Sequence, residues 1–425
     1  MPKEPGQQKN GAEQEPKKAK NKPAKKKPAG RPSISRSPQG AAGAARNALP
    51  YDMSARQKQV RRQRIMLLGI TLFLVLAAGV LVMAVTGVFS KDSDPVMPDL
   101  PKYTSFPAEQ GNAKRINPLT GLRDLNASAA GKRAVSFMVN NAPAARPQWG
   151  LCAPDVITET LVEGGITRML FMFSDLATVP KVGPIRSARH DFVEITEGFD
   201  SFLIHWGGSP QAYEAIKARG VNNLDGMVYS GKYFFRDKTR LNQGLAVEHT
   251  AYTNSEYITA GIAAKGWRTD VDPAKTSPFR FVTEGAAARV PIGGSAAAVN
   301  FRFSANYKYS FEYNKTTGLY AQYLNNTPFV QDGGQQRKVT NIILIYVDVQ
   351  QIAGDKKNRV NIDMSGGGGI YVTAGGWETI TWKKGKPAEP LQLLDKDGAV
   401  LELNRGKGYI GMVPIVQRTN TTVSE

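Results

Sequence analysis

The stretch SFLIHWGGSPQAYEAIKARG, residues 201–220, predicts a strand followed directly by a helix. Its first six residues form a short apolar run, which is typical of a buried strand. Ser209 is a preferred N-cap residue, and Pro210 suits the first helical position. Gly220 is typical of the residue that follows a helix end. The chain therefore changes at this point from a strand to a capped helix.

Two similar units precede this stretch. AVSFMVN and TRMLFMFS predict two more buried strands, at residues 134–140 and 167–174. APDVITETLVEGG (153–165) predicts a helix that begins at Pro154, and SARHDFVEITEG (187–198) predicts a helix capped by Ser187. The order βαβαβα is typical of an α/β domain with a mostly parallel sheet.

The pattern changes after about residue 290. VNFRFSANYKYSFEY, residues 299–313, alternates strongly and places Tyr307, Tyr309, Phe311 and Tyr313 on one face. This aromatic face predicts a core, and the alternative is a sugar-binding or partner-binding surface. TNIILIYVDV, residues 340–349, predicts a buried strand. The second domain is therefore predicted to be β-rich (α+β).

The net charge of +19 is concentrated near the N-terminus. Residues 1–64 hold 17 Lys/Arg and 4 Asp/Glu, a net charge of +13. This segment has too few apolar residues to bury a core, so we expect it to be disordered. A nucleic-acid-binding arm is the alternative, but no aromatic residues are interleaved with the lysines. We expect no nucleic-acid partner.

IMLLGITLFLVLAAGVLVMAVTGV, residues 65–88, is uncharged over 24 residues. This length spans the ~30 Å hydrocarbon core of a bilayer and exceeds the apolar region of a cleaved signal. Basic residues precede it and the following flank is near neutral, which places the N-terminus in the cytoplasm. The sequence therefore predicts a single-pass membrane protein with extracytoplasmic domains.

The predicted organisation has six parts. They are a basic cytoplasmic tail (1–64), a transmembrane helix (65–88), an extracellular spacer (89–115), an α/β domain (116–285), a β-rich domain (286–416) and a short tail (417–425). The lone cysteine, Cys152, excludes an intrachain disulfide.

Ligands of open parallel sheets bind beyond the carboxyl ends of the strands, where free N–H groups at helix N-termini favour anions. Polar, cationic and glycine residues gather at the predicted strand ends and in a later loop. Arg186 and Arg189 can project together and fork onto a phosphate or carboxylate. The predicted anion-binding residues are Asn140, Asn141, Arg168, Arg186, Ser187, Arg189, His205, Gly207, Gly208, Ser209, Arg236 and His249.

Three acidic residues, Asp155, Glu159 and Glu163, are four apart and would share one face of the helix predicted at 153–165. One interpretation is a structural ion network with the arginines. The other is an anion site or metal-assisted site built from the same groups. The sequence has no GxSxG, HExxH, CxxC or Walker motif, so no cofactor and no metal are predicted.

Four segments resemble the YerB-like family, secreted bacterial proteins that carry a domain of unknown function. They are RPQWGLCAPDVITETLVEGGITR, VGPIRSARHDFVEIT, HWGGSPQAY and FFRD…EHTAYT. TNIILIYV, TITWKKG and LDKDGAVLELNRGKGYIGMVP resemble the family's C-terminal domain. The resemblance covers about residues 116–416 and implies a two-domain, envelope-facing protein without agreed catalytic residues. Family members carry a lipidated cysteine after the signal, but here no cysteine lies directly after the apolar run.

Three functions fit these observations. The first is a non-enzymatic envelope protein that binds an anionic ligand or a partner in cell-wall synthesis. The second is an enzyme acting on a wall polymer or lipid-linked phosphate. In that case Arg168, Arg186 and Arg189 would stabilise charge, and Glu159, Glu163 or His205 would act as acid or base. The third is a purely structural scaffold.

Overall fold

The computed structural model describes residues 113–275 and 278–425. The predicted tail, the predicted transmembrane helix and most of the predicted spacer lie outside these residues. Within the described residues, no helix combines the length and apolar character needed to cross a membrane.

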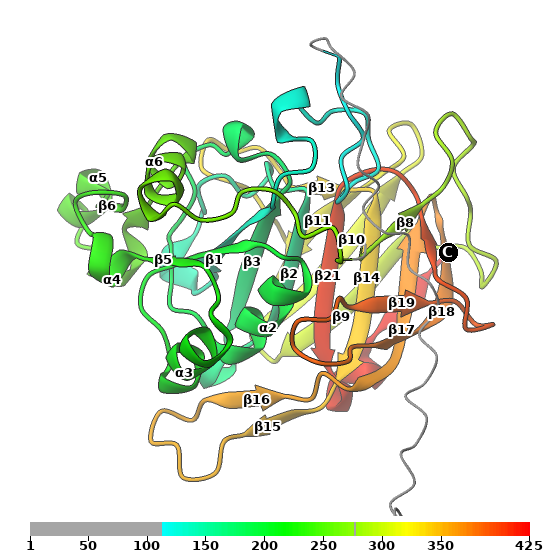
Figure 1. The fold of residues 1–425 in the computed structure, drawn as a ribbon. Helices are drawn as coiled ribbons and strands as arrows, with labels where there is room; N and C mark the ends of the chain where they lie inside the picture. Colours follow the sequence, from blue (N-terminus) through cyan, green and yellow to red (C-terminus); the bar gives the residue numbers. More distant parts are fainter. Residues whose placement is uncertain (1–112, 276–277) are drawn as a thin grey trace, which may run out of the picture. The chain divides into compact units, whose positions relative to one another are not determined.

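A ten-stranded sheet runs through the predicted α/β segment and the β-rich segment (Figure 1). Its strand order is β19-β18-β17-β14-β21-β2-β3-β1-β4-β5. The strands are β1 (Val135–Asn140), β2 (Val156–Leu161), β3 (Thr167–Phe173), β4 (Phe202–His205), β5 (Asn223–Asp225), β14 (Asn341–Val347), β17 (Gly366–Thr373), β18 (Gly376–Lys383), β19 (Gln392–Leu394) and β21 (Gly408–Pro414). This sheet contains strands from both sides of residue 285, near which the domain boundary is predicted. The boundary itself stays a prediction.

The strands predicted at 134–140, 167–174 and 201–206 are confirmed as β1, β3 and β4. The helix predicted at 153–165 is wrong, because this segment forms strand β2. The run VITETL is rich in β-branched residues, which pack well on a pleated surface and have lower helix propensity.

The prediction of a mostly parallel sheet is also wrong, because β3 runs antiparallel between β1 and β2. The parallel pairs are β1 with β4, β4 with β5, β2 with β21, and β14 with β21. The other neighbours in this sheet are antiparallel, so the sheet is mixed.

Two helices pack on one face of this sheet, α2 (His190–Gly198) and α3 (Pro210–Arg219). The predicted caps of α3 are confirmed: the Ser209 hydroxyl accepts a hydrogen bond from the Ala212 N–H, and Gly220 has φ 65°. Helix α2 begins later than predicted, with Arg189 at the N-cap position. Ser187 does not cap it, because its hydroxyl donates to the Trp206 carbonyl.

The opposite face of the sheet is covered by α6 (Ser255–Lys265) and a six-stranded sheet. Successive side chains of β1 show the two faces. Phe137 and Val139 pack in the core on the side of the six-stranded sheet, and Met138 packs on the side of α2 and α3. The strands of the second sheet are β9 (Ala298–Ser304), β10 (Tyr307–Asn314), β11 (Leu319–Leu324), β12 (Thr327–Pro328), β13 (Lys338–Val339) and β22 (Thr422–Ser424).

The aromatic face predicted in the second domain is confirmed as core. Tyr307, Tyr309 and Phe311 are buried. The Phe311 ring lies 5.0 Å from the ring of Tyr409 on β21. Every residue of β14 is buried, so the strand predicted at 340–349 is confirmed as well. The β-rich character of the C-terminal segment is therefore confirmed.

Short elements connect the layers. The helices are α4 (Gly226–Tyr229) and α5 (Lys238–Asn242), and the strands are β6 (Phe235–Arg236), β7 (Ala251–Tyr252), β8 (Arg280–Phe281), β15 (Val349–Gln351), β16 (Val360–Ile362) and β20 (Glu402–Leu403). The 3-10 turns are η1 (Ala127–Ala129), η2 (Pro143–Ala145), η3 (Glu163–Gly165), η4 (Leu176–Thr178), η5 (Val247–His249) and η6 (Ile415–Asn420).

Candidate functional site

One edge of the ten-stranded sheet collects most of the predicted site residues. The parallel strands β1, β4 and β5 all end at this edge. The antiparallel strand β3 begins there, with Arg168 opposite Asn140. Strand β2 also ends there, and the turn η3 follows it with Glu163. Residues far apart in the sequence are therefore brought together.

Four arginines and two glutamates interact at this edge, and we call them the arginine cluster. Its members are Arg168, Arg186, Arg189, Arg236, Glu163 and Glu248. Arg189 is fully engaged. Its Nε donates to Glu163 Oε2 over 2.9 Å, its Nη2 donates to Glu163 Oε1, and its Nη1 donates to the Ala188 carbonyl. This bidentate pair fixes the N-terminal end of α2.

Arg168 is 1% exposed and only partly satisfied. Its Nη1 donates to the Ser187 carbonyl over 2.7 Å, and its Nη2 lies 3.7 Å from Glu163 Oε1. Its Nε has no hydrogen-bond partner among the described residues. Burial and the charge of Arg189 lower the pKa of Arg168 well below its usual value, although Glu163 opposes this shift.

Arg186 is the arginine of the cluster whose side chain is least tightly paired. Its side chain is 31% exposed, and its ion pair with Glu248 is loose, with Arg186 Nη2 3.7 Å from Glu248 Oε1. Its Nε is buried and has no partner among the described residues. Arg236 lies nearby, stacked 3.8 Å from the centre of the Trp206 ring, and donates to the Val247 carbonyl. Burial and the charge of Arg186 lower the pKa of Arg236.

The cluster has more positive than negative charge, since four guanidinium groups meet two carboxylates. Glu163 contributes a full negative charge. Burial alone would raise its pKa, but the hydrogen bond from Arg189 and the charges of Arg168 and Arg189 lower it to about 2. Two positive charges remain in excess, and an anion can neutralise them.

The glycine and serine residues predicted here support the cluster through the backbone. The Ala188 N–H donates to the Gly207 carbonyl, and the Ser209 N–H donates to the Ala188 carbonyl. These bonds join the loop after β4 to the loop before α2. Gly207 has φ 76°, and a Cβ there would lie 3.3 Å from the Ser187 hydroxyl. Gly208 packs in the same way against the Tyr213 ring.

The two histidines of the predicted site differ in environment. His205 is fully buried, and its ring nitrogens lie 2.8 Å from the Gly207 carbonyl and 3.0 Å from Asn223 Oδ1. It therefore has no ring nitrogen free for a ligand. His249 Nδ1 lies 3.1 Å from Asn140 Nδ2. Burial lowers the pKa of His249; the charge of Glu248 opposes this shift, and the charge of Arg186 adds to it.

Asn141 and Glu159 lie apart from the arginines, in a group that we call the Glu159 cage. Glu159 Oε1 accepts hydrogen bonds from Asn141 Nδ2 (2.9 Å), from the Tyr309 hydroxyl (2.7 Å) and from Thr167. Its Oε2 accepts from the Tyr409 hydroxyl over 2.8 Å. Burial raises the pKa of Glu159. The cage is fully enclosed and joins β2 to the six-stranded sheet.

The helix face predicted for Asp155, Glu159 and Glu163 does not form, because Glu159 lies on strand β2, Asp155 precedes this strand and Glu163 lies in the turn η3. Asp155 binds elsewhere: its carboxylate accepts from Asn117 Nδ2 and from the Ser174 N–H. Burial raises its pKa. Of the three predicted acidic counter-residues, Glu163 alone pairs with an arginine of the cluster.

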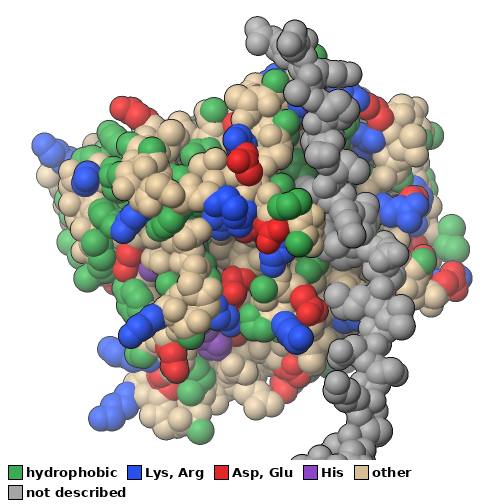
Figure 2. Space-filling model, viewed as in Figure 1, with side chains coloured by type: hydrophobic (Ala, Val, Ile, Leu, Met, Phe, Trp, Pro, Cys, Tyr) green, Lys and Arg blue, Asp and Glu red, His purple; other side chains and the backbone are tan. Residues whose placement is uncertain are grey.

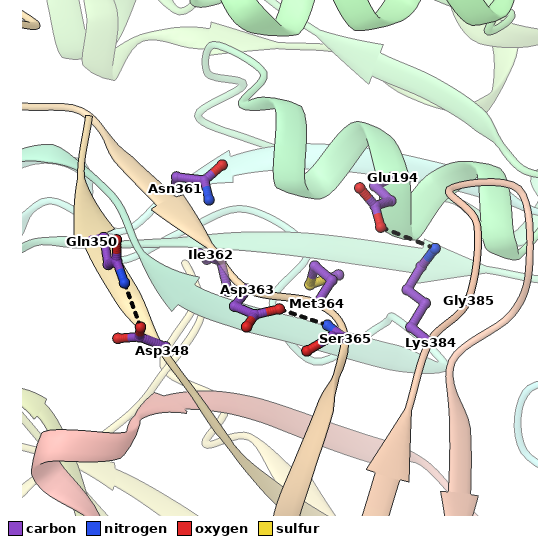
Figure 3. A pocket seen from close by; sticks show the side chains of 10 residues that line it. All are labelled: Glu194, Asp348, Gln350, Asn361, Ile362, Asp363, Met364, Ser365, Lys384 and Gly385. Carbon is purple, nitrogen blue, oxygen red and sulfur yellow. Dashed lines mark hydrogen bonds and ion pairs between the residues drawn. The ribbon is translucent and has the colours of Figure 1, made fainter. Parts of the chain in front are cut away.

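A separate polar hollow of about 570 Å³ lies beside α2 (Figure 3). Lys384 Nζ lies 3.3 Å from Glu194 Oε1 at one side, and Gln350 donates to Asp348 at the other. Its lining residues are Glu194, Asp348, Gln350, Asn361, Ile362, Asp363, Met364, Ser365, Lys384 and Gly385. Local sequence patterns do not reveal this hollow, because its walls come from segments at least 150 residues apart, such as Glu194 and Asp348.

Other surface features are less localised. On the face shown in Figure 2, Lys and Arg side chains are interspersed with Asp and Glu rather than gathered by sign. In the part of the chain that the structure describes, no group of three or more His, Cys, Asp or Glu side chains is placed to hold a metal ion.

Comparisons with known proteins agree with the family resemblance. A family model described as "Protein of unknown function (DUF3048) N-terminal domain" matches residues 119–268. The corresponding C-terminal domain model matches residues 299–410. Together the two models cover more than half of the chain.

A relative in Bacillus subtilis (strain 168), described as "Putative lipoprotein YerB", is 29% identical over 323 residues, which cover 74% of this chain and 91% of the relative. The solved structure described as "Crystal structure of YerB protein from Bacillus subtilis" matches with a TM-score of 0.63 at 28% identity. That match covers 73% of this chain and 100% of the solved chain.

Proposed function

We propose that this chain, which belongs to the YerB-like family with its two DUF3048 domains, is a membrane-tethered extracytoplasmic protein that binds an anionic envelope ligand at the arginine cluster. The observation that carries the proposal is the state of Arg186. It is part-exposed, has one loose ion pair at 3.7 Å, and has an Nε without a partner among the described residues.

The energetics of the cluster favour an anion. Placing several guanidinium groups together raises the local positive potential, which attracts negatively charged ligands. The Arg186 side chain is 31% exposed, so the outer part of its guanidinium can meet an acceptor oxygen of a ligand. Arginine also presents its donors in a fork that matches the oxygens of phosphate and carboxylate groups.

The structure favours binding over catalysis. Glu159, Glu163 and His205, the residues predicted as possible acids or bases, are not placed to transfer a proton to or from a ligand at the cluster. Glu159 is enclosed in its cage, and both ring nitrogens of His205 have partners. Glu163 has a pKa of about 2, so it is an ionised partner of Arg189 rather than a proton donor.

The tether is the second part of the proposal. The relative is described as a "Putative lipoprotein", and a lipoprotein is held to a membrane by its attached lipid. In this chain the uncharged run 65–88 has the length of a membrane span, and no cysteine lies directly after it to carry a lipid. We propose a single-pass anchor with the N-terminus in the cytoplasm, which keeps the arginine cluster on the outer side.

Titration with inorganic pyrophosphate tests the binding function. Residues 92–425 contain both family domains and leave out the uncharged run 65–88, so this segment is suitable for solution work. We expect pyrophosphate to bind at low ionic strength, as measured by calorimetry. Arg186→Ala should weaken the affinity about tenfold, ~1.4 kcal/mol.

The matched control is Arg280→Ala. Arg280 is 55% exposed and pairs with Glu402 at 3.0 Å, far from the cluster in sequence. Its replacement should leave the affinity unchanged, and both variants should unfold within ~1 kcal/mol of the parent. Equal affinities for both variants would show that the arginine cluster is not an anion site.

A further inference from the structure

Exposed apolar side chains lie beside the arginine cluster. Tyr213 on α3 is 42% exposed, Met227 and Val228 on α4 are 66% and 69% exposed, and Val247 in η5 is 58% exposed. We call these four residues the apolar rim. Single exposed apolar residues are ordinary, but a group of them at one place marks an interaction surface.

Helix α4 is tied to the cluster through Trp206. A Cβ at Gly226 would lie 2.4 Å from the Trp206 indole, so α4 packs directly against this ring. Arg236 stacks on the same indole. A Cβ at Gly207 would lie 3.6 Å from Met227 Cγ and 3.3 Å from the Ser187 hydroxyl. Met227 therefore lies at the loop that carries the arginines.

Val247 and Tyr213 are tied to the cluster in a similar way. The Val247 carbonyl accepts a hydrogen bond from Arg236, and the next residue, Glu248, is the ion-pair partner of Arg186. The Tyr213 ring packs on Gly208, and its hydroxyl donates to Asp225 over 2.7 Å. The rim therefore borders the cluster from three elements, α3, α4 and η5.

We infer that the anionic ligand is a lipid whose phosphate headgroup binds Arg186 and Arg236 and whose hydrocarbon chain contacts Met227, Val228 and Val247. This inference rests on the proposed anion site and adds the chemical class of the ligand. Surplus positive charge complements a phosphate, and the adjoining apolar side chains complement a hydrocarbon chain. A small hydrophilic anion would use the first feature alone.

A second exposed apolar pair shows that apolar exposure alone does not make such a site. Val290 and Ile292 are 58% and 82% exposed. The neighbouring Arg289 is neutralised by a two-point contact with Glu378, whose Oε2 lies 3.1 Å from Arg289 Nη1. This location has apolar side chains without the surplus charge, so it provides a matched control.

Co-sedimentation of residues 92–425 with lipid vesicles tests the inference. We expect binding to vesicles that contain phosphatidylglycerol and much weaker binding to pure phosphatidylcholine vesicles. The double variant Met227→Ser, Val228→Ser should weaken binding to the anionic vesicles about fivefold. Its affinity for pyrophosphate should stay within about twofold of the parent. The control variant Val290→Ser, Ile292→Ser should change neither quantity.

The outcomes distinguish a failure of the proposed anion site from a failure of the lipid inference. If the parent binds no pyrophosphate and no anionic vesicles, the anion site itself is wrong. If it binds pyrophosphate but both double variants bind vesicles as the parent does, the lipid inference is wrong and the anion site stands. Equal binding to both kinds of vesicle, or equal loss of vesicle and pyrophosphate binding in Met227→Ser, Val228→Ser, would also overturn the lipid inference.

Discussion

The arginine cluster and the Glu159 cage are built from neighbouring residues but differ in how far their charged groups are satisfied by partners. Thr167 belongs to the cage and Arg168 to the cluster, although they are consecutive on β3. In the cage, one carboxylate receives hydrogen bonds from four donors and is sealed from solvent. In the cluster, four guanidinium groups share two carboxylates and remain partly open. A satisfied polar group stabilises the fold, whereas an excess of donors is available for a ligand.

The separation of the two groups follows from the geometry of the sheet. Successive side chains of a strand point to opposite faces, so consecutive residues at one strand end lie in different layers. Asn140 meets His249, and the next residue, Asn141, bonds to Glu159. Polar residues that gather at a sheet edge therefore belong to two sites, and the predictions below test that separation.

The largest expected effect is on the cage. Glu159→Ala leaves Asn141, Thr167, Tyr309 and Tyr409 without their shared acceptor, in a fully buried position. We expect a loss of ~3–5 kcal/mol in the free energy of unfolding, because buried donors lose their partner. Urea denaturation of residues 92–425 measures this change.

A matched replacement is available on the surface of the second sheet. Glu312 is exposed on β10, and Glu312→Ala should change the unfolding free energy by less than ~0.5 kcal/mol. A similar small loss for Glu159→Ala would mean that the cage does not stabilise the fold and that its separation from the cluster is wrong.

A smaller effect is the pH dependence of the free energy of unfolding, to which Glu159 and Glu163 contribute with opposite signs. Burial raises the pKa of Glu159 above its usual 4.5. Its stabilising contribution is therefore complete below pH 4.5 and lost as the pH rises through the folded-state pKa. Glu163 is the reverse, since its pKa falls to about 2. Its contribution is complete above pH 4.5 and lost as the pH falls toward 2.

Glu159→Gln and Glu163→Gln, unfolded with urea across this pH range, measure the two contributions. Relative to Glu159→Gln, the parent should lose stability as the pH rises. Relative to Glu163→Gln, the parent should lose about 1 kcal/mol as the pH falls below 4.5, a small value because Glu163 is 26% exposed and its ion pair is screened. Slopes of the same sign in both comparisons would contradict the assignment.

Much of the architecture could be predicted from local sequence. The apolar runs at β1, β3 and β4 and the Ser209-Pro210 cap of α3 are short-range signals, and the structure follows them. The segment 153–165 has the local pattern of a helix, because Pro154 and the glycines at its end resemble helix boundaries and its acidic residues are four apart. The β-branched residues of β2 and its place between β3 and β21 determine a strand instead.

The site was only partly predictable. The strand ends identified Arg168, Arg186 and Arg189, because strand order brings them to one edge. The apolar rim could not be read from the sequence, since α3, α4 and η5 are separate segments that meet only after Trp206 has packed against Gly226. The Glu159 cage also depends on Tyr309 and Tyr409, which lie at least 150 residues further along the chain.

A crystal structure of residues 92–425 grown with tungstate tests the central claim most directly, because this heavy anion is located by its anomalous scattering. The account predicts one strong peak within hydrogen-bonding distance of Arg186, with none in the Glu159 cage. A structure whose tungstate peaks avoid Arg186, or in which Arg186 forms a close bidentate pair with Glu248, would contradict the account.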